Sequence, residues 1–398
     1  MTVDASPADE GQHPWKDGRT LPRVAWFGHG EGHRADGLST YSRELVDGLQ
    51  RRQVDVLFFG HDSDGWQTSA NRSVWLGGRR IHALTVSRPG SLARVQRELV
   101  QFQPDVVHIS WSFSQLDGAI ARRAHRVGAG TVATFHLPYA PRGTARGRAL
   151  ELLYRLQMIN LRHVDTCIAL SDGQASLLRQ AGYPASRIHV INNCVDDESI
   201  TPGASPLKAH FGATLLVGYM GRLDPEKRVL ALAESFLRQR WPDDHVLAIA
   251  GSGRQEAQLR RLAAGRRNIK LLGKLLEPQD RLDLLRATDI FVLPSTAEGL
   301  ALSMLEAMAA GCAVAATDAG EDGAALGAAG VLLPIHPLEP HLSNALTTLA
   351  ADSALRAQLG SAARSRVEQQ FGLRAHLDRV LGAYTAAGHA AARRSLAG

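Results

Sequence analysis

The chain has 398 residues, which is long enough for two domains that each bury a core. Its 44% of hydrophobic residues and its 38 glycines are typical of an α/β enzyme and exclude a disordered or fibrous protein. The net charge of +6 fits an anionic substrate or a membrane surface equally well, but the sequence has no basic tract interleaved with aromatic residues, so we expect no nucleic-acid partner.

The amino-terminal segment is polar and lacks the apolar core of a signal peptide, so residues 1–20 are predicted to be a disordered tail. The cysteines Cys167, Cys194 and Cys312 lie far apart and have no metal-ligand spacing, which favours a reduced, cytoplasmic setting over a disulfide framework. No stretch approaches the roughly 18 apolar residues of a spanning helix. We therefore expect a cytoplasmic protein, with peripheral membrane contact and oligomeric state left open.

Short apolar strands alternate with amphipathic helical segments after this tail. The series begins with the strand RVAWFG and ends near the strand IHVINNCV. Such alternation is typical of a parallel sheet covered by helices, so residues 21–200 are predicted to form a Rossmann-like domain. The acidic, Ser-, Pro- and Gly-containing stretch from Asp196 to Pro206 then interrupts the pattern and is the predicted interdomain linker.

A glycine-bearing loop, GHGEGHRADGL, follows the first predicted strand. Gly28 and Gly30 fit the start of a dinucleotide-binding fingerprint, but His33 occupies the third glycine position. The loop therefore argues against a dehydrogenase that binds its cofactor here.

His136 closes the predicted strand TVATFHL. A lone histidine is most often structural, and a functional role at the end of a strand is the alternative. His29, His33 and His108 have weaker claims, and none has zinc-type spacing. We expect no metal site.

A second alternating series runs from the strand LLVGYMG to the strand GVLLPI, so residues 207–372 are predicted to form a second Rossmann-like domain. Three helical stretches finish the chain. Two such domains in tandem leave a cleft between them, which is a common place for a ligand.

The segment GYMGRLDPEKR collects basic residues at a predicted helix start. Asp224 and Pro225 are a good N-cap and first-turn pair, so Arg222, Lys227 and Arg228 would surround a helix N-terminus. Positive side chains are disfavoured at that end of the helix dipole unless an anion binds there. The segment therefore predicts a phosphate site, and long side chains that simply extend into solvent are the alternative.

Two carboxylates, Glu298 and Glu306, bracket the apolar run GLALSML. If the segment is helical, they lie roughly 12 Å apart along the axis. That is too far for a glycosidase pair, whose carboxyl groups lie about 5 to 9.5 Å apart. The strand IFVLPS ends just before, where open α/β sheets bind ligands. The pair is predicted to hold the two ends of one elongated ligand. The alternative is that Glu298 is merely favoured by the dipole at a helix N-terminus and Glu306 is an ordinary exposed residue.

The segment STAEGLALSMLEAMAAGCAVAATDAG resembles the Glu-x7-Glu signature of the retaining nucleotide-sugar glycosyltransferases of family 4, and the similarity extends in order from about Arg23 to about Tyr384. The resemblance implies the GT-B fold: two Rossmann-like, doubly wound parallel-sheet domains that face a cleft. The first would bind the acceptor and the second the nucleotide sugar. A C-terminal helix over about residues 373–390 would cross back to the first domain.

The resemblance also implies roles in the second domain. Glu298 would contact hydroxyls of the donor sugar and Glu306 the ribose. Arg222 and Lys227 would neutralise the donor diphosphate, whereas Arg228 stands where the family often has a small residue and has no assigned role. The remaining implied donor contacts are the backbone amides of Gly299, Leu300 and Ala301 for the diphosphate and the strand end near Leu275 for the base.

Two first-domain positions carry over as well. The family usually has two adjacent glycines in the first loop, and this chain has Asp36 and Gly37. Gly37 would approach the phosphates or the acceptor, while Asp36 is a departure from the pattern. The implied role of His136 is a hydrogen bond to the donor sugar. The loops His61–Gln67 and Pro138–Gly147 are expected to select the acceptor.

Together these features predict a hexosyltransferase that uses a nucleotide diphosphate sugar, with UDP expected. The implied reaction retains the anomeric configuration, needs no metal, and lets the departing phosphate take the acceptor proton. The acceptor hydroxyl could belong to a small molecule, a natural product, a lipid or a polysaccharide. A sugar-nucleotide epimerase or phosphorylase of similar fold, and a non-catalytic nucleotide-sugar binding protein, are the alternatives.

Overall fold

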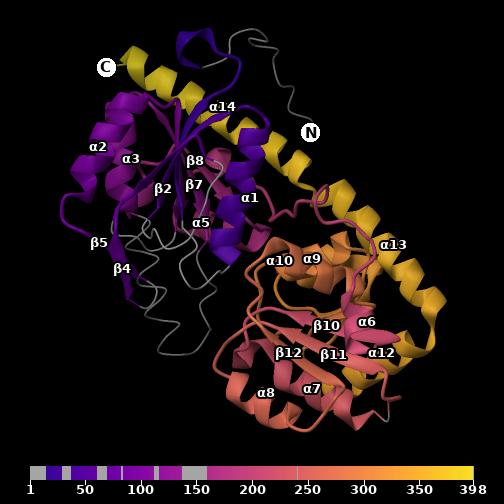
Figure 1. Ribbon diagram of the computed structural model, residues 1–398. Coiled ribbons are helices and arrows are strands. Elements are labelled where there is room, and N and C mark those ends of the chain that lie inside the picture. The colour runs from indigo at the N-terminus through magenta and orange to yellow at the C-terminus, as the bar shows by residue number, and fades with distance from the viewer. Residues whose placement is uncertain are drawn as a thin grey trace, which may run out of the picture. The chain divides into compact units, whose positions relative to one another are not determined.

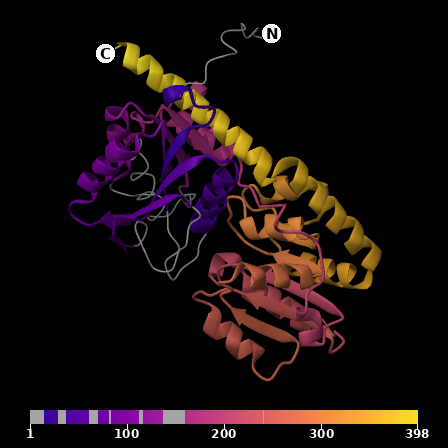
Figure 2. The same cartoon turned by 45° about the horizontal axis from the view of Figure 1, so that its top comes forward.

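A computed structural model describes residues 15–28, 37–60, 70–81, 84–111, 116–136, 159–239 and 241–397. The chain divides into two compact units, one formed by Met1–Ile191 with His376–Gly398 and the other by Asn192–Ala375. In each unit a parallel sheet has helices packed against it (Figures 1 and 2).

The first unit is built on a seven-stranded sheet in the order β3-β2-β1-β6-β7-β8-β9, in which every pair of neighbours is parallel. The strand order reverses between β1 and β6, as in a doubly wound fold. The strands are β1 Arg23–Phe27, β2 Asp55–Gly60, β3 Arg72–Trp75, β6 Val106–Trp111, β7 Gly130–Phe135, β8 Thr166–Ala169 and β9 Ile188–Val190. The helices described in this unit are α1 Gly37–Arg51, α2 Ser91–Phe102, α3 Asp117–Arg126 and α5 Asp172–Gln180.

The second unit repeats this design with a six-stranded parallel sheet in the order β12-β11-β10-β13-β14-β15. Its order reverses between β10 and β13. The strands are β10 Leu215–Met220, β11 His245–Ala250, β12 Ile269–Gly273, β13 Ile290–Leu293, β14 Ala313–Thr317 and β15 Val331–Leu333. The helices are α6 Leu207–Phe211, α7 Val229–Arg238, α8 Glu256–Ala263, α9 Pro278–Ala287, α10 Leu302–Ala309, α11 Asp322–Leu326, α12 Glu339–Ala351 and α13 Ser353–Gln370.

Central strands of both sheets are buried along their whole length, for example β6, β7, β10 and β13. Because helices cover both faces of a parallel sheet, neither face is exposed to solvent, and the central strands are therefore mostly apolar. That is why the alternation in the sequence predicted them correctly.

The last helix, α14 (Leu373–Ala397), leaves the second unit and packs on the first. The buried ring of His108 on β6 hydrogen-bonds to the Tyr384 hydroxyl at 2.8 Å and to the Thr134 hydroxyl at 2.7 Å. Gly130 allows a close approach, because a Cβ there would lie 2.5 Å from the carbonyl oxygen of Ala387. The predicted C-terminal helix that returns to the first unit is therefore confirmed.

Some local expectations differ from the structure. Residues 15–20 are not part of a disordered tail: Trp15 is buried, and the Lys16 ammonium donates to the carbonyls of Pro104 and Val127. The sequence did not predict this packing, because a single apolar residue in a polar segment gives no periodic signal. Residues 1–14 lie outside the described residues.

The division between the units falls at Ile191, before the predicted linker Asp196–Pro206. Arg364 on α13 explains the shift, since its guanidinium donates to the carbonyl oxygens of Asp197 and Ile200 and holds this stretch on the second unit. The sequence pattern did not predict β3 or the antiparallel pair of β4 Gly78–Ile81 and β5 Leu84–Ser87, because strands of four residues are too short for a clear alternation. None of the helices in the described ranges combines the length and the hydrophobicity that a membrane span requires.

Candidate functional site

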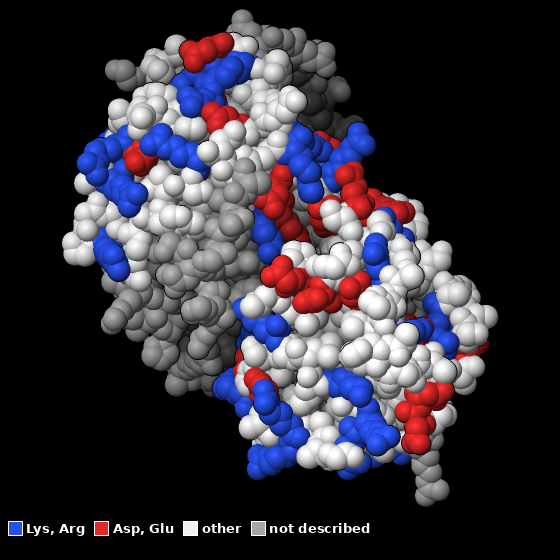
Figure 3. Space-filling model, in the orientation of Figure 1, with Lys and Arg blue, Asp and Glu red and all other residues white. Residues whose placement is uncertain are grey.

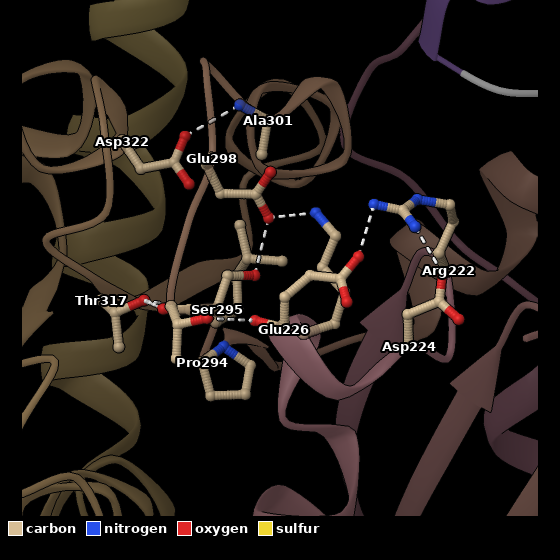
Figure 4. A network of polar contacts seen from close by, with 12 residues as sticks. Arg222, Asp224, Glu226, Pro294, Ser295, Glu298, Ala301, Thr317 and Asp322 are labelled. Carbon is tan, nitrogen blue, oxygen red and sulfur yellow. Dashed lines mark hydrogen bonds and ion pairs between the residues drawn. The ribbon is translucent and has the colours of Figure 1, made fainter. Parts of the chain in front are cut away.

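The loops after β10 and β13 meet at the centre of the second unit's sheet. These two strands are neighbours, and the strand order reverses between them. The carboxyl ends of strands at such a reversal are the usual ligand site of an open α/β sheet. The backbone N–H of Thr296 donates to the carbonyl of Glu226 at 2.7 Å, which ties the loops together. Residues that lie some 70 positions apart in the sequence thus share one site (Figure 4).

The contact between Lys227 and Glu298 is the centre of this site. The Lys227 ammonium pairs with Oε1 of Glu298, and the Ser295 hydroxyl donates to the same oxygen at 2.6 Å. The two side chains are only 13% and 9% exposed. Oε2 of Glu298 makes no hydrogen bond with the described residues. The carboxylate is therefore held by one oxygen, and the other can accept a hydrogen bond from a ligand.

Arg222 lies at the outer side of the same cluster. Its guanidinium pairs with Asp224 and, at 2.9 Å, with Glu226, and its side chain is 56% exposed. Asp224 also accepts from the guanidinium of Arg254 at 3.1 Å. Arg222, Arg254 and Lys227 thus pair with the three carboxylates of Asp224, Glu226 and Glu298. Figure 4 shows Arg222 beside Asp224 and Glu226.

The predicted helix N-terminus at Asp224 is wrong in its details. Residues Pro225–Lys227 form a single 3-10 turn, and α7 begins only at Val229. The Asp224 carboxylate caps no backbone amide of that turn, because it pairs with arginines instead. The basic residues therefore surround a turn rather than the start of a long helix.

Arg228 has a structural role. Its backbone is left-handed, with φ of 50°, and its guanidinium donates to the carbonyls of Pro294 and Ile335, each at 2.8 Å. These bonds fix the loop after β13. The sequence assigned Arg228 no role, because the carbonyls that it binds come from segments 66 and 107 positions away.

The segment from Glu298 to Glu306 is not one helix, contrary to the premise of the 12 Å separation. Residues 298–301 form a loop, and α10 begins at Leu302. Glu306 lies inside α10, is only 3% exposed, and pairs with Arg281 on α9. Sequence reasoning missed this arginine, because a single Arg in a helix gives no sign of a partner on another helix. Contact of Glu306 with a ribose stays a prediction.

The backbone amides after Glu298 lead into α10. Those of Gly299 and Leu300 donate to no acceptor in the described part of the chain, so neither is committed to a protein partner. The amide of Ala301 instead donates to Oδ1 of Asp322 at 2.8 Å (Figure 4). A diphosphate can use that third amide only if Asp322 releases it.

Asp322 was not among the predicted site residues. It is fully buried at the start of α11, and burial followed by the nearby charge of Glu298 raises the pKa of its carboxyl to about 8. A short acidic segment, AGEDG, was the sole sequence signal. Ser295 was missed for a similar reason, since one serine after a strand has many structural explanations.

The remaining predicted residues lie at strand ends and helix starts. Leu275 follows β12 and packs, half-buried, against the core of the second unit. In the first unit, Gly37 is the first residue of α1, and His136 follows β7. The ring of His136 makes an edge contact with the Tyr41 ring at 4.9 Å between centroids. Gly30, His29, His33, Asp36 and both predicted acceptor loops lie outside the described residues.

His108 is structural, as its weaker claim suggested. Burial, followed by the charges of His136 and His376, holds its pKa well below the usual value, so its ring is neutral. Both ring nitrogens are occupied by Tyr384 and Thr134.

Acidic and basic side chains are mixed on the face in view in Figure 3, and among the described residues there no single continuous basic area appears. This mixture agrees with the scattered arginines of the sequence. It gives no support to a nucleic-acid partner.

Known proteins match this chain over most of its length. Residues 35–199 match the family model described as Glycosyltransferase Family 4, and residues 214–352 match Glycosyl transferases group 1. A GDP-mannose-dependent alpha-mannosyltransferase of Mycolicibacterium smegmatis is 29% identical over 356 residues, which cover 83% of this chain and 89% of that protein. A GDP-mannose-dependent monoacylated alpha-(1-6)-phosphatidylinositol monomannoside mannosyltransferase of Corynebacterium glutamicum is 39% identical over 137 residues, 32% of this chain and 35% of that protein.

Among solved structures, Anabaena HepE in complex with UDP-glucose superposes with a TM-score of 0.72 at 18% identity, covering 90% of this chain and 98% of that one. This likeness concerns the fold alone. Together with the two parallel sheets, it confirms the predicted GT-B class.

Proposed function

Because the chain belongs to glycosyltransferase family 4 and is a nucleotide-sugar-dependent glycosyltransferase, we propose that it transfers a hexose to an acceptor hydroxyl with retention of anomeric configuration. The donor site in this proposal is the cluster of Lys227, Glu298 and the free amides that precede α10. The contact of Lys227 with Glu298 carries it, since two motifs far apart in sequence meet there in a nearly buried pair.

The cluster has the groups that a sugar diphosphate needs. A leaving diphosphate gains negative charge as the sugar–phosphate bond breaks, and fixed cations and amides stabilise that charge. Lys227 retains two N–H donors beyond the one used by Glu298. The exposed guanidinium of Arg222 can turn toward a diphosphate, and the amides of Gly299 and Leu300 can donate to it. Oε2 of Glu298 would then accept from a sugar hydroxyl.

Retention in this proposal follows from attack on the face that the diphosphate leaves, with the leaving phosphate oxygen taking the acceptor proton. Such a reaction requires no side chain as a base. His136 would contact the donor sugar, and Glu306 the ribose. No metal takes part in these steps, and we expect transfer to continue when EDTA is added.

Two donors have support. UDP is the nucleotide expected from the sequence, and a UDP-sugar is bound in the similar HepE structure. GDP-mannose is favoured by the names of both curated relatives described above. The loops expected to select the acceptor, His61–Gln67 and Pro138–Gly147, lie outside the described residues.

The test uses a panel of nucleotide sugars. Thermal stabilisation by each donor identifies the nucleotide, and nucleotide release with pools of small-molecule, lipid and polysaccharide acceptors then measures turnover. We expect release that depends on an acceptor, with a product whose anomeric coupling in NMR matches the configuration of the donor. An inverted product refutes retention. Release without acceptor points to an epimerase-like or hydrolytic enzyme, dependence on free phosphate to a phosphorylase, and stabilisation without turnover to a binding protein.

A matched pair of variants locates the site. Lys227→Ala should lower transfer by about 10²- to 10³-fold, whereas Lys208→Ala should leave it unchanged. Lys208 also pairs with a carboxylate in the second unit, Asp289, but on α6 and away from the loops after β10 and β13. Equal rates for the two variants would remove Lys227 from the reaction.

A further inference from the structure

Asp322 links two segments of the second unit whose positions decide the shape of the donor loop, residues 298–301. The Oδ1 atom of Asp322 accepts a hydrogen bond from the Ala301 amide at 2.8 Å. The backbone amide of the preceding residue, Glu321, donates to the Gly299 carbonyl at 2.8 Å. Gly320 makes this close approach feasible: its φ is 63°, and a Cβ there would lie 2.1 Å from the Glu298 carbonyl oxygen. Residues 320–322 therefore brace the donor loop.

The second carboxyl oxygen of Asp322 has no hydrogen-bond partner among the described residues, although the residue is 0% exposed. A buried carboxylate with an unpaired oxygen is costly, whereas a neutral carboxyl loses much less on burial. The geometry thus favours the protonated group.

Burial and the two nearby glutamates favour the neutral form of Asp322 as well. Burial contributes most to the raised pKa of about 8, and the Glu298 carboxylate adds to it. Glu321 raises the pKa further, while Lys227 and the Ala301 amide lower it. At neutral pH most molecules therefore carry an uncharged Asp322 beside the proposed diphosphate site.

We propose that Asp322 is a positioning residue whose neutral form holds the donor loop for the diphosphate, so that sugar-nucleotide binding selects the protonated carboxyl. The inference rests on the proposed function, since it requires a diphosphate at the amides of Gly299 and Leu300. In its neutral form, Asp322 keeps Ala301 in place through its carbonyl oxygen and adds no negative charge next to the ligand. Once ionised, the Asp322 carboxylate repels both the diphosphate and the Glu298 carboxylate.

The expected change in ligand affinity with pH follows from proton linkage. If the ligand binds only the protonated form, its affinity falls by the factor by which that form is depleted. For a group that titrates near pH 8, the loss between pH 7 and pH 9 is about tenfold. At pH 8, where about half of the molecules are ionised, binding takes up about half a proton per ligand.

Calorimetric titration of GDP-mannose and UDP-glucose at pH 7 and pH 9 tests the proposal. Wild type should lose about tenfold in affinity, and Asp322→Asn, which keeps the acceptor for Ala301 but cannot ionise, should lose less than about twofold. Ionisation of the nucleobase is common to both proteins and cancels in the comparison. Asp318→Asn, which removes an exposed carboxylate from the same loop, should behave as wild type.

Equal losses in wild type and Asp322→Asn would overturn the proposal. If that variant does not fold, wild type alone decides: titrations at pH 8 in buffers of different ionisation enthalpy should reveal proton uptake on binding, and no uptake would refute selection of the neutral form. Failure of every sugar nucleotide to bind at any pH would instead contradict the proposed function.

Discussion

Lys227→Ala separates the stabilising role of Lys227 from its role toward the donor. The substitution leaves Glu298, which is 9% exposed, with the Ser295 hydroxyl as its hydrogen-bond partner. Removing one member of a buried ion pair costs about 3–5 kcal/mol, and the remaining serine places the expected loss of unfolding free energy near 3 kcal/mol. A domain of ordinary stability remains folded after such a loss.

The effect on transfer should be larger than the effect on folding suggests. Loss of one donor that faces a developing charge typically lowers the rate by about 10²- to 10³-fold. Adding Glu298→Gln to Lys227→Ala removes the unpaired charge and should restore at least about 1 kcal/mol of stability without restoring activity. Lys208→Ala breaks a more exposed pair and should cost no more than about 1 kcal/mol with full activity.

Urea unfolding monitors the stability of these variants, and initial rates of nucleotide release at saturating acceptor give kcat/KM for the donor. Stability losses of Lys227→Ala and Glu298→Gln that simply add in the double variant would refute the buried-pair reasoning. Recovery of transfer in the double variant would show that Lys227 acts only by balancing the charge of Glu298.

Three further predictions follow from single contacts. Asp322 has a folded-state pKa of about 8 against 3.8 in the unfolded chain, so the unfolded state releases its proton first and stability falls as pH rises from about 4 to about 8. Between pH 6 and pH 8, the free energy of unfolding in urea should fall by about 2 kcal/mol more for wild type than for Asp322→Asn. An equal fall in both proteins would contradict a raised pKa of Asp322. Arg228→Ala removes donors to the carbonyls of Pro294 and Ile335 and should lower the unfolding free energy by about 2–4 kcal/mol, whereas an unchanged urea midpoint would rule out its structural role. Tyr384→Phe deletes the hydroxyl that binds the buried His108 and should cost about 1–3 kcal/mol, with faster hydrogen exchange in α14; wild-type exchange there would show that the bond does not anchor the helix.

The sequence predicted well those features that depend on regular patterns. Apolar strands alternating with helices predicted both sheets, because buried parallel strands such as β10 and β13 are continuous apolar runs. The resemblance to a family also placed Lys227 and Glu298 in one site, and the structure brings these two side chains into contact. Binding of a donor there stays a prediction.

Contacts between distant segments had no such signal. Asp322 reaches Ala301 across 21 positions, and Arg281 reaches Glu306 across 25, through bonds that depend on how the strands are ordered. Helix boundaries were also misplaced: the apolar run after Glu298 looks helical, yet α10 begins four residues later because residues 299–301 are held by Glu321, Asn193 and Asp322. Such bonds follow from the tertiary fold and leave no periodic pattern in the chain.

A crystal structure of the protein with a bound sugar nucleotide tests the donor site most directly. We predict a β-phosphate within hydrogen-bonding distance of Lys227 Nζ and of the Gly299 and Leu300 amides, with a sugar hydroxyl on Glu298. A diphosphate bound elsewhere, with Lys227 and Glu298 still paired and free of contact with the ligand, would contradict the proposed site.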